Sequence, residues 1–118
     1  MTYFRIDAAD RDHTWMLDPA QQVSYGWVGD EERSARAGVS CCGSIEDLAV
    51  YFGTTGGDLS GDRVIVELEG TRSADRPLDA ELGEYLVHPT RIASVIDLDD
   101  AADFWPVYNR KAEETFGC

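Results

Sequence analysis

The most regular pattern of apolar and polar positions along the chain lies between Gly38 and Gly53. Residues 39–42 form a short apolar run that predicts a buried strand, and the glycine after them ends it. Ser44 and Asp47 then match a capping box, in which the Ser44 hydroxyl satisfies an amide of the first helical turn. The helix is predicted to end at Gly53, a residue type suited to the left-handed conformation. Its buried face consists of apolar residues at helical spacing: Ile45, Leu48, Ala49 and Phe52.

Other stretches show the alternation or the β-branched composition of strands. The first of them places Phe4 and Ile6 on one face and Arg5 on the other. Another stops at Pro89, which cannot donate to a central ladder and so marks a bend or a sheet edge. The predicted strands are residues 3–7, 63–69, 85–88 and 92–98.

The remaining segments are polar or carry helix signals. Residues 8–37 are polar and irregular, with residues 15–17 predicted to anchor them to the core. His13 lies in this segment and is expected to be solvated. Residues 99–111 predict a helix, either continuous or restarting at Pro106. The predicted loops are residues 54–62 and 70–83.

These elements predict one α+β domain that spans residues 1–118. The length suffices for a single hydrophobic core and is too short for two. Strands outnumber helices, so we expect a mixed or mostly antiparallel sheet of about five strands with two or three helices.

The charge balance narrows the classes of partner. The chain carries 23 Asp and Glu residues against ten Lys and Arg residues, for a net charge of −13. Such a surface repels phosphate backbones and anionic membranes, so we expect no nucleic-acid or membrane partner. Two interpretations of the acidity remain: simple solubility, or a surface that meets a basic protein partner. No apolar run approaches the ~18 residues of a membrane span, and the N-terminus lacks an export signal, so a cytoplasmic location is expected.

The three cysteines predict neither a disulfide framework nor a metal site. Cys41 and Cys42 are adjacent, so strand alternation would place them on opposite faces. No Cys-x-x-Cys spacing is present, and we expect no bound metal and no disulfide between this pair.

Three short motifs, in their order along the chain, resemble the ADP-ribosyltransferase fold family, especially its small bacterial members. Tyr3-Phe4-Arg5-Ile6 is similar to the first motif, whose Arg or His holds NAD, with Arg5 as the match. Gly38-Val39-Ser40-Cys41-Cys42 and the helix after it resemble the second, with Ser40 in place of the serine; the family usually has Ser-Thr-Ser there. Gly83-Glu84-Tyr85-Leu86 resembles the last motif, which supplies the catalytic glutamate, with Glu84 as the match.

The resemblance implies an NAD-dependent ADP-ribosyltransferase, or a protein that binds NAD or a related nucleotide. Cleavage of the nicotinamide–ribose bond develops oxocarbenium character, which the carboxylate of Glu84 would stabilise. Arg5 would bind the diphosphate and Ser40 would orient the ligand, while Tyr51 could stack on the nicotinamide. One alternative is an acidic immunity- or antitoxin-type protein that binds a basic partner without catalysis. Another is a structural accessory protein without a ligand.

Overall fold

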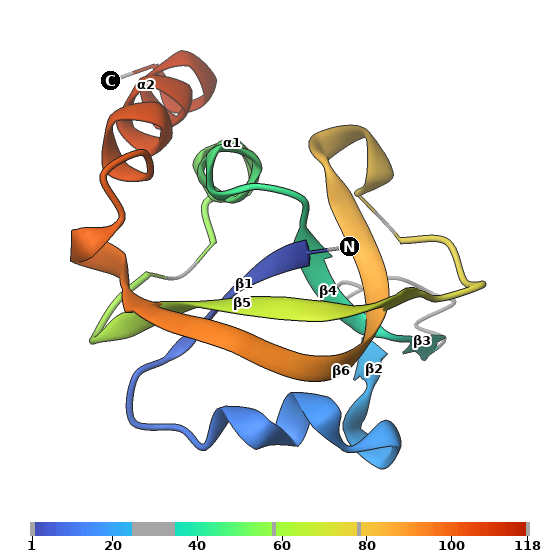
Figure 1. Cartoon of the computed structure of the whole chain (residues 1–118). Helices are drawn as coiled ribbons and strands as arrows, with labels where there is room; N and C mark the ends of the chain where they lie inside the picture. The colour runs from blue at the N-terminus through green and yellow to red at the C-terminus, as the bar shows by residue number, and fades with distance from the viewer. Residues whose placement is uncertain (1, 25–34, 58, 78, 118) are drawn as a thin grey trace.

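The computed structural model describes residues 2–24, 35–57, 59–77 and 79–117. In this part of the chain, four antiparallel strands close into a barrel in the order β1-β4-β6-β5, and two short strands pair beside it (Figure 1). One α-helix packs on the barrel and the second packs on the first, and the predicted α+β class with antiparallel pairing is confirmed. The strands are β1 (Thr2–Ala8), β2 (Val23–Ser24), β3 (Arg36–Ala37), β4 (Val39–Cys42), β5 (Arg63–Arg72) and β6 (Glu84–Asp97). The helices are α1 (Ile45–Thr55) and α2 (Trp105–Phe116), and the 3-10 turns are η1 (His13–Leu17), η2 (Pro19–Gln21), η3 (Ala80–Leu82) and η4 (Leu98–Asp100).

Strand register sorts the barrel residues into two faces, because directly paired residues share a face. On β1, Phe4 and Ile6 face the two α-helices, and Phe4 pairs with Cys42 of β4. Arg5 pairs with Val66 of β5 and therefore faces the other side, where η1 packs. The helix-side cluster is Ile6, Cys42, Leu48, Ala49, Ile65, Leu98, Ala101 and Phe104. The η1-side cluster is Met16, Val39, Val64, Val66 and Leu68.

Helix α1 begins as predicted and ends later than predicted. The Ser44 hydroxyl accepts the amide of Asp47 at 3.0 Å, which confirms the cap. The predicted stop at Gly53 is wrong, because α1 continues to Thr55 and Gly56 takes the left-handed conformation with φ 70°. Gly53 is instead buried against α2: an added Cβ would lie 3.0 Å from the Tyr108 carbonyl oxygen. The absence of a side chain at this position serves helix packing rather than helix termination.

The two strands predicted at residues 85–88 and 92–98 are one strand, β6, which passes through Pro89. Pro89 is tolerated because pairing with β4 covers only residues 84–87, so the proline lies where β6 has β5 as its described partner. Opposite it stands Gly70, at which an added Cβ would lie 2.4 Å from the His88 carbonyl oxygen. Register shifts beside Gly70 accompany the curve of β6 in Figure 1.

Two further predicted boundaries differ from the structure. The helix predicted over residues 99–111 exists as α2, which has Pro106 in its first turn, so the restarting alternative describes it. Residues 8–37, predicted to be irregular, contain η1, η2, β2 and β3 in their described part, and residues 25–34 lie outside the described residues. Met16 is fully buried and Trp15 packs on the η1-side cluster, which confirms the predicted anchor.

Candidate functional site

A pocket of about 210 Å³ lies where β1 and β4 part. The two strands share a single register pair, Phe4 with Cys42, so beyond it their backbones diverge. The divergence leaves a gap between the barrel wall and α1 that side chains from all three elements surround. The lining residues are Arg5, Ile6, Ser40, Cys41, Cys42, Leu48, Tyr51 and Phe52.

Arg5 crosses this gap from the η1 side. Its Nη1 donates to the Ser40 carbonyl oxygen at 2.8 Å. Its guanidinium also lies 5.3 Å from the ring centre of Trp15. The Nε atom is buried and has no hydrogen-bond partner among the described residues. Burial lowers the pKa of Arg5, opposed by the nearby Asp7, but an arginine remains protonated at neutral pH.

Ser40 joins Arg5 to Glu84. The Ser40 hydroxyl donates to Oε2 of Glu84 in a short hydrogen bond. The other carboxylate oxygen of Glu84, Oε1, accepts the amide of Asp79 at 2.9 Å. Glu84 is 8% exposed and does not line the pocket itself, so its carboxylate reaches the site through Ser40.

Tyr51 approaches the same pocket from α1. Its hydroxyl donates to Oδ2 of Asp79 at 2.9 Å, which ties α1 to the segment before β6. Burial and this hydrogen bond raise the pKa of Tyr51, so the phenol stays protonated at neutral pH. The ring meets that of Phe52 edge-on, with 5.8 Å between ring centres. Its orientation is therefore set by packing as well as by the Asp79 carboxylate.

The two cysteine thiols of the pocket are free and protonated. Cys41 and Cys42 lie on opposite faces of β4, as strand alternation predicted, and both are buried. Burial raises the pKa of each thiol to about 12. Since the thiolate is the nucleophile and the metal ligand, these thiols are inert at neutral pH. Cys118 lies outside the described residues.

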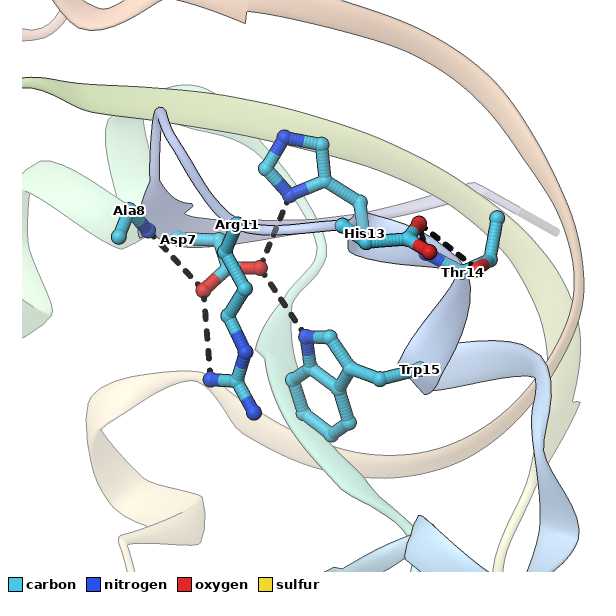
Figure 2. A network of polar contacts seen from close by, with 7 residues as sticks. Asp7, Ala8, Arg11, His13, Thr14 and Trp15 are labelled. Carbon is cyan, nitrogen blue, oxygen red and sulfur yellow. Dashed lines mark hydrogen bonds and ion pairs between the residues drawn. The ribbon is translucent and has the colours of Figure 1, made fainter.

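A second polar cluster is centred on Asp7, two residues after Arg5 on β1 (Figure 2). Asp7 is 5% exposed and accepts the Ala8 amide, the Trp15 indole N–H and His13 Nδ1 at 2.9–3.1 Å. Arg11 completes the cluster at 3.7 Å from the carboxylate. The prediction that His13 is solvated is wrong, because its side chain is 14% exposed and bonded to Asp7. Sequence reasoning missed the pair because η1 folds His13 back onto β1.

The structure thus brings together the residues predicted to form a site. Arg5 and Glu84 both contact Ser40, and Tyr51 lines the pocket with Arg5 and Ser40. Two residues with a direct part in this geometry were missed. Trp15 was predicted only to anchor its segment to the core. The available signal was strand alternation, which places Asp7, the hydrogen-bond partner of Trp15, on the same face as Arg5. Asp79 carried no signal, because the sequence shows it as one acid in a charged loop.

Within the described ranges, no group of three or more His, Cys, Asp or Glu side chains is arranged to hold a metal ion. None of the described helices is both long enough and apolar enough to cross a membrane.

Comparisons with protein-family models, with curated proteins and with solved structures each return no match. The site must therefore be interpreted from its own residues.

Proposed function

We propose that the pocket between β1, β4 and α1 binds NAD, and that Glu84 promotes cleavage of the nicotinamide–ribose bond in an ADP-ribosyltransferase-like reaction. The observation that supports this most is the chain of contacts Arg5–Ser40–Glu84. It places a buried guanidinium and a buried carboxylate on opposite sides of one small hydroxyl residue.

Each residue has a task that its contacts suit. The buried Arg5 Nε lacks a partner among the described residues, so a phosphate or carbonyl oxygen of the ligand could satisfy it. Glu84 is held by two donors, the Ser40 hydroxyl and the Asp79 amide, so its negative charge can stabilise developing positive charge in the pocket through Ser40 without reorganising. In the reaction the C1′–N bond breaks and nicotinamide leaves with the electron pair. An acceptor then bonds to C1′ and gives up a proton.

The volume of the pocket limits how much of the ligand it encloses. Drug-sized ligands occupy pockets of roughly 300–1,000 Å³, and this one holds about 210 Å³. We therefore place only the nicotinamide riboside end of the dinucleotide inside. Apolar side chains such as Leu48 and Phe52 would pack against the base, with Tyr51 beside it. The adenosine end would extend along the surface.

A single substitution tests the chemistry. Glu84→Gln should lower the rate of nicotinamide release by about 100-fold or more, because the charge that stabilises the transition state is lost. The Kd for NAD should change little, since the ground state carries less of that charge. The rate would be followed by chromatography of released nicotinamide, and the fold would be checked by thermal melting.

The matched control is Glu81→Gln, at an exposed acid three residues away in η3. It removes the same charge from the same segment without touching Ser40, so the wild-type rate is expected. Equal rates for wild type and Glu84→Gln, or equal losses in both variants, would contradict the role of Glu84.

The alternative, binding of a basic protein partner without catalysis, is favoured by the net charge of −13. Exposed acids cluster at the turn before α2, where Asp97, Asp99, Asp100 and Asp103 are all exposed. NAD binding by the pocket would separate the two, because the alternative requires no nucleotide. Under either proposal a cytoplasmic location fits, since NAD and reduced thiols are found there.

A further inference from the structure

The buried carboxylate of Asp7 fixes the position of an indole ring. Burial alone would raise the pKa of Asp7, but hydrogen bonds from His13, Trp15 and the Ala8 amide, together with the charge of Arg5, outweigh it and the net shift is downward. Asp7 is therefore ionised at neutral pH and can only accept hydrogen bonds. Its Oδ2 accepts the Trp15 indole N–H at 3.1 Å (Figure 2). His13 must then carry a proton on Nδ1, which donates to the same oxygen.

The ring held in this way meets two guanidinium groups. The ring centre of Trp15 lies 5.3 Å from Arg5 and 4.4 Å from Arg11. An arginine within about 6 Å of an aromatic face is attracted to it, and the attraction strengthens when both partners are desolvated. Arg5 is the desolvated partner, whereas the side chain of Arg11 is 51% exposed.

Arg5 needs such a neighbour because its other contacts are few. Its described hydrogen bond is the one from Nη1 to the Ser40 carbonyl, and the buried Nε has no described partner. A long side chain held by one hydrogen bond can rotate so that its guanidinium turns away from the pocket. The Trp15 face restricts the guanidinium without using any of its N–H donors, so the Nε–H stays available to a ligand.

We propose that Trp15, held by Asp7, is a positioning residue that orients Arg5 toward the pocket. The orientation of Arg5 in the ligand-free protein follows from these contacts alone. The effect of Trp15 on the affinity for NAD rests on the proposed function. The competing interpretation is that Trp15 only fills space beside the η1-side cluster.

NMR relaxation of the Arg5 side chain tests the orientation directly. The Arg5 ¹⁵Nε–¹H signal, identified by its loss in Arg5→Lys, reports through its heteronuclear NOE how restricted the guanidinium is. Trp15→Met keeps apolar volume but removes the aromatic face, so the NOE should fall toward that of exposed arginines. Trp15→Phe keeps a face but cannot donate to Asp7, so its NOE should lie between the two. If Trp15→Met does not fold, the Phe variant carries the test.

The control is Trp105→Met in α2. Trp105 is also partly buried and also donates its indole N–H to an aspartate, Asp99, at 3.0 Å. It packs on Phe104 and Tyr108 instead of on Arg5, so the Arg5 NOE should keep its wild-type value.

The same variants, titrated with NAD, test the consequence for binding. Trp15→Met should raise the Kd about tenfold, equivalent to ~1.4 kcal/mol, while Trp105→Met should leave it within about twofold of wild type. An Arg5 NOE that stays at the wild-type value in both Trp15 variants, or falls equally in Trp105→Met, would overturn the positioning role. If the variants give the expected NOE pattern but the wild-type protein does not bind NAD, only the proposed function is refuted.

Discussion

At the scale of single residues, the site depends on one small side chain between two opposite charges. Ser40 accepts from Arg5 with its backbone carbonyl and donates to Glu84 with its hydroxyl. The resemblance of three motifs, in their order along the chain, to those of the ADP-ribosyltransferase fold family predicted a shared site for these residues, whereas the apolar pattern predicted only the strands that carry or adjoin them. The support from Asp79 and Trp15 could not be predicted, since it depends on how a loop and η1 fold back onto the barrel.

The contribution of Asp7 to the free energy of unfolding should depend on pH. Its folded-state pKa is lowered from the ordinary 3.8, so its contribution to stability is present above pH 3.8 and is lost as the pH falls through the folded value. Asp7→Asn should therefore lower the free energy of unfolding by about 1–3 kcal/mol at pH 7. The difference from wild type should shrink below pH 3.8.

Urea unfolding of both proteins from pH 7 down to pH 2.5 measures this difference. Asp10→Asn is the control, because Asp10 is an exposed acid near the cluster with no described side-chain hydrogen bond, so its difference from wild type should be small at every pH. A stability difference for Asp7→Asn that stays constant across the range would refute the assignment of Asp7 as the ionised acceptor of the cluster.

At the scale of elements, local signals predicted where structure begins better than where it ends. The Ser44 cap fixed the start of α1 because it acts within one turn. α1 is capped by Gly56, a later glycine than predicted, and Gly53 is needed for contact with α2, which sequence alone could not supply. Pro89 was read as a strand end for a similar reason: its tolerance within β6 depends on Gly70 of β5 across the ladder.

The close approach of the two helices yields a prediction. Gly53→Ala should destabilise the protein by about 1–3 kcal/mol through overpacking, because the new Cβ would lie 3.0 Å from both the Tyr108 carbonyl oxygen and Lys111 Cβ. Helix propensity alone predicts the opposite sign, since alanine is favoured over glycine within a helix by about 1 kcal/mol. The sign of the change in urea unfolding decides between packing and propensity.

Val50→Ala, on the same helix at a partly exposed position, serves as the comparison, because it shortens a side chain without adding any atom between the helices. A Gly53→Ala protein more stable than wild type would show that α1 and α2 can accommodate the added Cβ, contrary to the 3.0 Å separation.

At the scale of the whole molecule, a buried arginine lies within a strongly acidic protein. The net charge of −13 repels free anionic ligands at long range, so binding of a dinucleotide must come from short-range contacts in the pocket. Added salt should screen that repulsion. The affinity for NAD should therefore depend on the contact with Arg5, since it is the arginine that lines the pocket.

Isothermal titration of NAD into wild type, Arg5→Ala and Arg91→Ala measures that contribution most directly. Arg91 is an exposed arginine on β6 that pairs with Glu69, far along the strand from Glu84. Wild type and Arg91→Ala should bind NAD with similar Kd values. Arg5→Ala should bind at least about tenfold more weakly, as the loss of a charged hydrogen bond implies. A folded wild-type protein that gives no binding heat, or a Kd that is the same in all three proteins, would contradict the proposal that this pocket is an NAD site.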